Sequence, residues 1–237
     1  MKIALMGYGK MGKTIERLAV ERGHEIVLKV DKDIDNADLS QADLSQADVA
    51  IDFSVPDAAF KNISACFKKQ VPVVSGTTGW LKRYDEAVEI CKEQEAAFIY
   101  ASNYSLGVNL FFELNRNLAK LMQRFSEYNV AIEEVHHTQK LDAPSGTAIT
   151  LAEQIIENSD KTGWQLDSAR ENEIPVTAKR IENVPGTHTI SYNSEVDTIK
   201  IEHVAHSRDG FALGAIIAAE WLQHKKGVFS MKDVLGL

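Results

Sequence analysis

Cysteine, basic charge and long apolar runs are all scarce in this sequence, and each shortage narrows what the protein can be. The 237 residues include only two cysteines, Cys66 and Cys91, which lack metal-type spacing and cannot form a disulfide framework. We therefore expect a protein of the reducing cytoplasm. No stretch of about 18 consecutive apolar residues occurs, which argues against a membrane-spanning helix.

The balance of charge is acidic. The 26 lysines and arginines are outnumbered by 34 aspartates and glutamates, and the formal net charge is −8. This balance argues against a protein that mainly binds nucleic acid or an anionic membrane, because both attract basic surfaces. An anionic substrate stays possible, since it needs only a local positive site. Residues 3–6 are apolar and are not preceded by a basic segment, so we expect no secretory signal here.

Short apolar stretches alternate with longer amphipathic ones through the first part of the chain. We expect strands at residues 2–6, 25–31, 49–54, 71–75 and 97–101, and helices at residues 11–22, 56–69 and 82–95. Strands and helices that alternate at this spacing predict an α/β fold with a Rossmann-type parallel sheet covered on both faces. The near-duplicate at residues 37–48 is too short to be a stacked repeat and is predicted to be a polar surface connection.

The rhythm changes after residue 104 and becomes α+β. The pattern predicts helices at 107–124 and from 146, a strand at 129–135, and a three-strand meander at 177–181, 188–193 and 197–203. A last helix at about 210–224 is expected to end the regular structure and to return to the first domain. We therefore predict a dinucleotide-binding domain of residues 1–104 and about 208–237. Residues 105–207 would form a substrate-binding and oligomerisation domain with a mixed or antiparallel sheet.

Three glycines lie between the first predicted strand and helix with the spacing G-x-G-x-x-G. There they permit a tight turn, the approach of a pyrophosphate to the backbone, and close helix–strand packing. The helix N-terminus would also offer free N–H groups to phosphate. Asp31 ends the second strand, where a carboxylate can bond an adenine ribose. NADH or NADPH is therefore the predicted cofactor, and a purely structural turn is the alternative. The predicted contacts are Gly7, Tyr8, Gly9, Lys10, Met11, Gly12 and Asp31.

The choice between the two nicotinamide cofactors stays open. Asp31 favours NADH because a carboxylate repels a 2′-phosphate, whereas Lys32 beside it either offsets that repulsion or is a solvated loop lysine. Two further loops follow predicted parallel strands, and ligands of such sheets gather at the carboxyl ends of the strands. These loops are predicted to line the nicotinamide pocket, although each alone is as well explained as a turn. Their residues are Gly76, Thr77, Thr78, Ala101, Ser102, Asn103 and Tyr104.

The segment from His136 to Thr147 gathers the groups that acid–base chemistry needs. His136 and His137 end a strand, so their side chains begin on opposite faces. Lys140 follows in the loop, and Ser145 is placed to cap the next helix. The N–H groups of the first helical residues would then point toward an anion at the helix end. A small carboxylated substrate with proton transfer fits this set, whereas a His-rich surface loop is the plain alternative.

A metal site is the competing functional interpretation of this segment. Adjacent histidines have poor metal spacing, and no third ligand stands close in sequence, so no metal is predicted. Glu133 and Glu134 precede the histidines, and either would be able to orient an imidazole.

At this point the residues resemble the dihydrodipicolinate reductase family over nearly the whole chain. The most specific block runs from Glu134 through His136, His137 and Lys140 to Ala148. Further matching segments are residues 7–12, 76–79, 103–109, 186–189 and 203–215. The resemblance implies reduction of a cyclic dicarboxylate imine to tetrahydrodipicolinate in lysine and diaminopimelate synthesis, with NADH or NADPH as hydride donor.

The resemblance also implies roles for individual residues. His136 resembles the family's acid/base residue and Lys140 its proton donor. His137, Ser145, Gly146 and Thr147 resemble the groups that hold substrate carboxylates. The family is usually a homotetramer that assembles through the substrate domain's sheet, and its domains close on the ligands. Two features depart from the family: the connection between Asp31 and residue 49 is short, and Asp31-Lys32 replaces the commoner Glu-Arg pair.

Two other functions are weighed against the reductase. Another Rossmann-type dehydrogenase, acting on an amino acid or a sugar, would not need the anion site between Lys140 and Thr147. A non-catalytic NAD(P) sensor would bind the cofactor without turnover, and it gives no reason for the His136/Lys140 pair.

Overall fold

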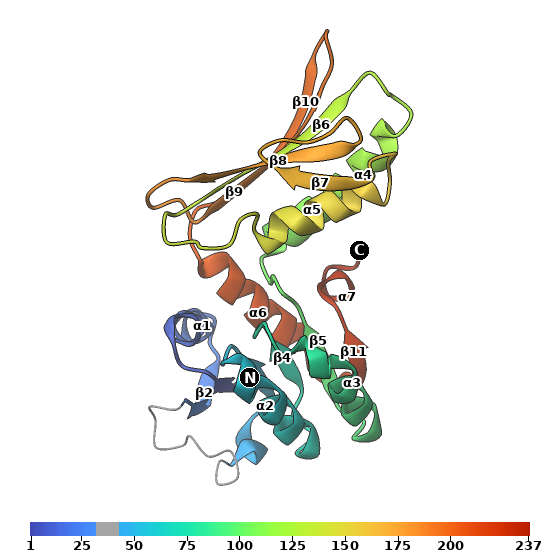
Figure 1. Cartoon of the computed structure of the whole chain (residues 1–237). Helices are drawn as coiled ribbons and strands as arrows, with labels where there is room; N and C mark the ends of the chain where they lie inside the picture. The colour runs from blue at the N-terminus through green and yellow to red at the C-terminus, as the bar shows by residue number, and fades with distance from the viewer. Residues whose placement is uncertain (32–42) are drawn as a thin grey trace. The chain divides into compact units, whose positions relative to one another are not determined.

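The computed structural model describes residues 1–31 and 43–237, which form two compact units. The first unit comprises Met1–Leu106 and Asp209–Leu237, and the second comprises Gly107–Arg208. Figure 1 shows the elements of both. Lys32 and the first part of the near-duplicate at 37–48 lie outside the described residues. None of the helices in the described part of the chain is long and apolar enough to cross a membrane.

The first unit is built on a six-stranded sheet in which all neighbouring strands are parallel, with the order β11-β5-β4-β3-β1-β2. This confirms the predicted α/β class. Because β2 and β3 lie on opposite sides of β1, the strand order reverses at β1, where ligands of open α/β sheets bind. The strands are β1 (Lys2–Met6), β2 (Glu25–Val30), β3 (Val49–Asp52), β4 (Val73–Ser75), β5 (Ala97–Tyr100) and β11 (Gly227–Phe229).

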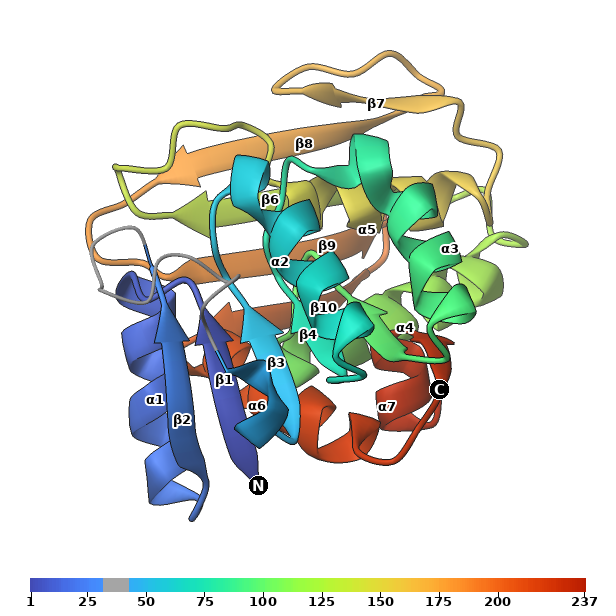
Figure 2. The ribbon, with the colours of Figure 1, turned by 90° about the horizontal axis from the view of Figure 1, so that it is seen from below.

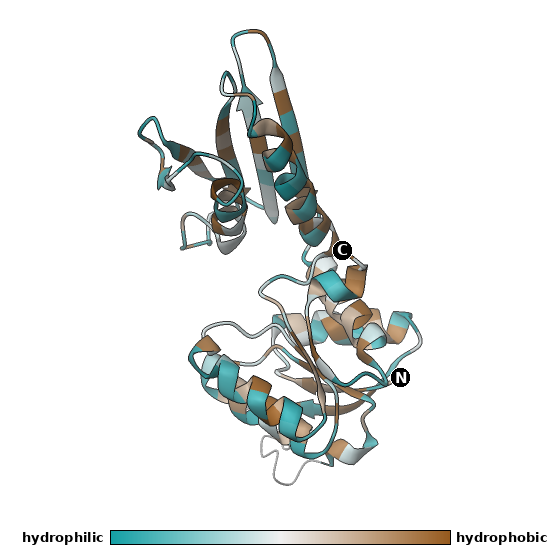
Figure 3. Cartoon of the chain, turned by 90° about the vertical axis from the view of Figure 1, so that its right-hand side faces the viewer, coloured by the Kyte–Doolittle hydropathy of each residue, from teal (hydrophilic) through white to brown (hydrophobic). Residues whose placement is uncertain are grey.

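Helices cover both faces of this sheet, as Figure 2 shows. On one face, α2 and α3 enclose a core that includes Phe67 and Phe98, whose rings meet edge to face. On the other face, α1 and α6 pack over a core that includes Ile15 and Ile216. The strands are mostly hydrophobic in Figure 3, whereas the helices also carry hydrophilic bands. The helices are α1 (Lys10–Glu21), α2 (Pro56–Lys68), α3 (Tyr84–Glu93), α6 (Asp209–Leu222) and α7 (Met231–Leu235), with short 3₁₀ turns at Leu44–Gln46 and Leu81–Arg83.

The expectation that the last long helix ends the regular structure was wrong. Strand β11 follows α6 and pairs with β5 at the edge of the sheet, and α7 follows in turn. A three-residue strand is too short to display the alternation of apolar and polar residues by which strands are recognised.

The second unit contains a mixed five-stranded sheet in the order β10-β9-β6-β8-β7. Its strands are β6 (Asn129–His136), β7 (Gly163–Leu166), β8 (Glu173–Arg180), β9 (Gly186–Asn193) and β10 (Thr198–Ala205), and its helices are α4 (Leu106–Met122) and α5 (Gly146–Ile156). The predicted meander is confirmed for β9 and β10, which pair antiparallel, but it was wrong for β8, because β6 lies between β8 and β9 and runs parallel to β8. Strand β7 was not predicted.

Strand β6 supplies both the core and the site of the second unit. Its residues alternate between buried and more exposed positions, so Ile132 joins Leu151 of α5 and Ile190 of β9 in the core. The same alternation buries Glu134 and His136 beyond Ile132. A buried carboxylate and imidazole at the centre of a sheet are costly unless they are paired, and they therefore mark a candidate site.

Candidate active site

The predicted cofactor residues that the structure describes all belong to the first unit and follow parallel strands. The glycine loop follows β1, Asp31 follows β2, and the loops that begin at Gly76 and Ala101 follow β4 and β5. Carboxyl ends of parallel strands lie at one edge of a sheet, so the topology brings these four segments to the same edge. The backbone ties them together, because Gly7 N donates to Val30 O at 2.7 Å and Gly76 N donates to Asp52 O at 2.8 Å.

The three glycines of the first loop serve different needs. A Cβ on Gly7 would lie 2.2 Å from the Phe53 carbonyl oxygen, and one on Gly12 would lie 2.3 Å from Gly7 O. Close packing against these backbone atoms therefore leaves no room for a side chain at either position. Gly9 has open space around it and is the N-cap of α1 without a side-chain cap, so the helix start is free to receive phosphate. These residues fit a dinucleotide.

Asp31 contacts the glycine loop directly. Its Oδ2 accepts a hydrogen bond of 2.6 Å from Tyr8 N, and its side chain is half-buried. Tyr8 bonds Glu16 and Lys29 through its hydroxyl, so the ring is held beside the loop. Lys10 and Met11 begin α1, where Lys10 is exposed.

The loop after β4 is fixed by a buried carboxylate that the sequence analysis did not single out. Asp52 is 0% exposed, and its oxygens accept hydrogen bonds from Ser54, Asn62, Ser75 and Thr77 at 2.7–3.2 Å. Burial raises the pKa of Asp52, against the effect of these four donors. The only signal in the sequence was a charged residue ending an apolar strand.

The side chains of Thr77 and Tyr104 are hydrogen-bonded inside the protein and are therefore not available to a ligand. Thr77 Oγ1 donates to Asp52 and accepts from Ser54 N, and the Tyr104 hydroxyl donates to the carbonyl oxygens of Ser75 and Ile99. Tyr104 is 1% exposed. Thr78 and Ser102 are exposed, and Gly76, Ala101 and Asn103 are half-buried.

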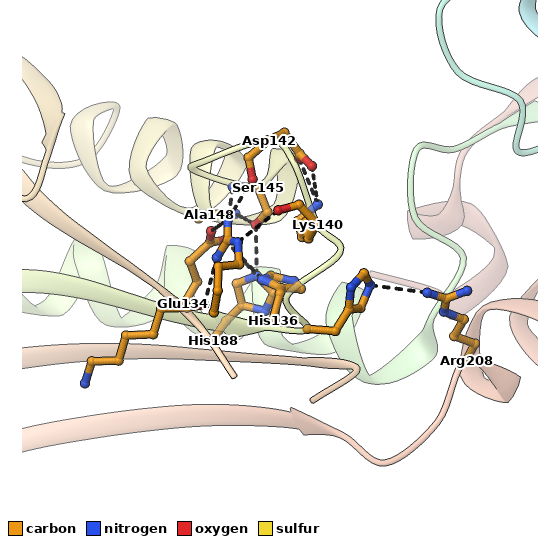
Figure 4. Close-up of polar contacts among 11 residues, drawn as sticks. Glu134, His136, Lys140, Asp142, Ser145, Ala148, His188 and Arg208 are labelled. Carbon is orange, nitrogen blue, oxygen red and sulfur yellow. Dashed lines mark hydrogen bonds and ion pairs between the residues drawn. The ribbon is translucent and has the colours of Figure 1, made fainter. Parts of the chain in front are cut away.

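In the second unit, the predicted catalytic histidine meets a second histidine from another strand (Figure 4). The rings of His136 on β6 and His188 on β9 lie edge to face with centroids 5.0 Å apart. Glu134 Oε2 is 3.6 Å from His136 Nδ1 and 3.7 Å from His188 Nε2. His188 was not proposed for the site, although the segment 186–189 was part of the family resemblance.

Burial and charge set the protonation of this cluster. Burial, together with the positive charges of Lys140 and Arg180, lowers the pKa of His136 to about 4, although Glu134 acts in the opposite direction. Burial alone would raise the pKa of Glu134, but the nearby His188 ring and the hydrogen bond from Ser145 N lower it to about 2. Near neutral pH, the site therefore holds an ionised carboxylate beside a neutral imidazole.

The loop after β6 carries Lys140, whose ammonium group is held by a neighbouring carboxylate. Its Nζ donates to both oxygens of Asp142 at 2.8 Å, and this bond lowers the pKa of Asp142. Arg180 of β8 holds the loop by donating hydrogen bonds to the carbonyl oxygens of Lys140 and Asp142 at 3.2 and 2.7 Å. Sequence reasoning missed Arg180, because nothing in the spacing places β8 beside β6.

Ser145 starts α5 as expected. Its Oγ accepts from Ala148 N at 3.2 Å and shares a hydrogen bond of 3.1 Å with His188 Nε2. The first amides of a helix have no partner within it, so those of Gly146 and Thr147 face the end of α5. A Cβ on Gly146 would meet nothing within 4 Å, and this residue is exposed. The helix start is therefore open to an anion.

His137 lies apart from His136, as the strand alternation required. Its Nε2 shares a hydrogen bond of 3.2 Å with Arg208 Nη2. The two side chains line a cavity of about 290 Å³ with Glu182 and Asn183. Arg208 brings a second cation toward the predicted substrate residues, and sequence reasoning did not single it out.

Glu134, His136 and His188 have the ligand spacing of a metal site, with their candidate atoms within 4.8 Å of one another. Both Glu134 oxygens are already engaged, however, by Ser145 N at 3.0 Å and by the Arg180 guanidinium at 3.2 Å. A guanidinium on the same carboxylate disfavours a metal cation there. The expected absence of a metal stays a prediction.

Comparisons with known proteins agree along the whole chain. The family model described as "Dihydrodipicolinate reductase, N-terminus" matches residues 1–104, and that described as "Dihydrodipicolinate reductase, C-terminus" matches residues 107–235. A 4-hydroxy-tetrahydrodipicolinate reductase from Christiangramia forsetii is 64% identical over 99% of this chain and 98% of its own length. The same-named protein from Thermosipho africanus is 33% identical over 99% and 98%.

Among solved structures, a dipicolinate-bound dihydrodipicolinate reductase from Paenisporosarcina sp. TG-14 has the same fold. It matches with a TM-score of 0.76 at 23% identity and covers 97% of each chain.

Proposed function

This chain belongs to the dihydrodipicolinate reductase family, and we propose that it acts on 4-hydroxy-tetrahydrodipicolinate in lysine and diaminopimelate biosynthesis. The substrate loses water to form the cyclic dicarboxylate imine dihydrodipicolinate, which gains a hydride and a proton to give tetrahydrodipicolinate. One observation carries the proposal for this chain's own residues. A buried imidazole, a held lysine ammonium and an open helix start converge within the second unit. This set suits a substrate that carries negative carboxylates and gains a proton.

Each residue has a part in the proposed reaction. The Gly146 and Thr147 amides, with Ser145 and His137, hold the substrate carboxylates. Lys140 donates the proton that reduction requires, and His136 exchanges protons with the site. The carboxylate of Asp142 keeps the Lys140 ammonium directed until the substrate arrives.

The glycine loop, Asp31 and the loops after β4 and β5 would hold NADH or NADPH, which supplies the hydride when bound. Tyr104 and Thr77 would contribute through their backbone, because their side chains are engaged inside the protein. We place the enzyme in the cytoplasm as a homotetramer. Support for assembly comes from β10, which ends the order of the described sheet and exposes Ile199 and Val204 by 39% and 45%. Light scattering of the purified protein measures the assembly.

The test couples the purified protein to a dihydrodipicolinate-synthesising enzyme and follows the oxidation of NADH and NADPH in parallel. We expect turnover, and the two rates rank the cofactors. Lys140→Ala and His136→Ala should each lower kcat by on the order of 10²–10⁴-fold while cofactor affinity stays near that of the wild type. Lys179→Ala is the matched control, since this lysine is half exposed and paired with Glu133.

The outcome also separates the alternatives. Turnover of an amino acid or sugar, with none of the dicarboxylate, would indicate a different dehydrogenase. Cofactor binding without turnover would indicate a sensor. Near-normal activity of both variants at Lys140 and His136 would refute the assigned roles.

A further inference from the structure

Glu134 occupies a place where a carboxylate has no access to water. It lies on β6, the central strand of the second unit's sheet, and is 0% exposed. A buried charge is tolerated only when hydrogen bonds and opposite charges compensate for lost hydration. Its partners come from three different segments: Ser145 at the start of α5, Arg180 on β8, and His188 on β9.

Two of these contacts connect Glu134 to different parts of the proposed substrate site. Ser145 N donates to Glu134 Oε2 at 3.0 Å, which fixes the residue directly before the open amides of α5. Arg180 Nη2 donates to Glu134 Oε1 at 3.2 Å and, at 2.7 Å, to the carbonyl oxygen of Asp142 in the Lys140 loop. A single carboxylate thus sets the anion-binding helix start and the lysine loop relative to each other.

The same carboxylate faces the imidazole that the proposed reaction needs. His136 Nδ1 lies 3.6 Å from Glu134 Oε2 and has no hydrogen-bond partner among the described residues. The other charged or titratable groups that face His136 are His188, Lys140 and Arg180, and each of them opposes protonation of the ring. Glu134 is the one group in this set that favours the protonated ring.

We propose that Glu134 is a positioning residue for the proposed reaction: it aligns Lys140 with the α5 amides through Arg180 and Ser145, and its carboxylate faces Nδ1 of His136, where it attracts a proton that arrives on the neutral ring. The inference rests on the proposed function. Arg180 is its counterpart, because its guanidinium anchors the loop but repels a proton from His136. The carboxylate and the guanidinium therefore move the titration of His136 in opposite directions.

Two substitutions test this opposition. Glu134→Gln keeps the size of the side chain but removes the charge, so the His136 midpoint should fall by about one pH unit. Arg180→Met removes the opposing cation and should raise the same midpoint. Glu133→Gln is the matched control, because this neighbour points to the other face of β6 and pairs with exposed Lys179.

The titration is followed by NMR of ring-labelled histidines in the full chain, with the His136 signal assigned from the His136→Gln variant. In the coupled assay, Glu134→Gln should lower kcat/KM at least tenfold and shift the pH profile with the midpoint, while the NADH dissociation constant is unchanged. Arg180→Met should raise KM for the dicarboxylate, because its loop is released. If Glu134→Gln does not fold, the Arg180→Met titration decides alone, since this side chain is 21% exposed.

Opposite shifts of the midpoint, with no shift in Glu133→Gln, support the inference. An unmoved midpoint, or shifts of the same sign, overturns it and leaves Glu134 a purely structural residue. If the wild type does not turn over the dicarboxylate, the proposed function fails instead. The NMR titration needs no turnover, so the two failures are distinguishable.

Discussion

The buried carboxylate of Asp52 offers the sharpest test of how the first unit holds its ligand loops. Replacing it with alanine removes the acceptor of four hydrogen bonds. Asn62 Nδ2 still donates to Ser54 Oγ at 3.1 Å, so these two side chains keep a partner. The hydroxyl groups of Ser75 and Thr77 lose the acceptor that they now use.

The expected magnitude follows from these two stranded donors. A buried donor left unpaired costs about 1–3 kcal/mol, so Asp52→Ala should lower the free energy of unfolding by roughly 2–6 kcal/mol. Such a loss is a large share of the roughly 5–15 kcal/mol that stabilises a typical domain. Asp52→Asn should lose less, because the amide oxygen still accepts and the burial that raises the pKa of Asp52 no longer opposes a charge.

Urea unfolding followed by tryptophan fluorescence measures the effect at fixed protein concentration. Trp80 is a local probe, since its Nε1 donates to Thr77 O at 2.8 Å. The exposed Glu89 on α3 provides the control variant Glu89→Ala. A midpoint of Asp52→Ala equal to that of the control would refute the reasoning. The NADH dissociation constant should also rise in Asp52→Ala, because the loop after β4 loses its anchor.

Three further predictions use matched pairs or a single titration. Gly9→Ala should fold normally but weaken NADH binding, whereas Gly12→Ala, whose Cβ would lie 2.3 Å from a carbonyl oxygen, should lower the melting temperature. Gly214→Ala brings a Cβ to 1.7 Å from a carbonyl oxygen and should yield little folded protein, whereas Gly210→Ala meets only ordinary contact at 3.6 Å and should be tolerated. In the folded protein the pKa of His136 is lowered from the ordinary histidine value of 6.5 to about 4. As the pH falls, the unfolded chain therefore protonates at this residue before the folded protein does. The resulting stability is full above pH 6.5 and declines toward pH 4 by on the order of 3 kcal/mol, and His136→Gln should flatten this slope in urea titrations.

Local signals made the first unit readable from sequence. The glycine motif lies between a strand and a helix, and each strand is a short apolar run beside an amphipathic helix. The hydrophobic periodicity and the positions of the glycines therefore predict the same elements. Strand β11 was not predicted, because Gly227–Phe229 is too short to be distinguished from a loop by its sequence. Its place at the sheet edge depends on pairing with β5, a partner far away in sequence.

Non-local pairing also explains what the sequence could not supply in the second unit. His136, Lys140 and Ser145 lie within one segment, so their gathering was predictable. His188 and Arg180 reach the same point only because β6 lies between β8 and β9. No spacing rule encodes that order, since strand pairing is selected by shared burial across the whole sheet. Strand β8 also begins at Glu173, four residues before the strand predicted at 177–181.

The discontinuity of the first unit has a consequence for synthesis on the ribosome. Its residues up to Leu106 emerge first, yet the apolar surface of Ile3 and Ile15 is covered by α6, which begins at Asp209. The intervening unit carries its own core and leaves the exit tunnel before α6 does. Domains generally fold as they emerge. We therefore expect the order of folding to invert the order of the chain, with the second unit native while the first still awaits its last helix.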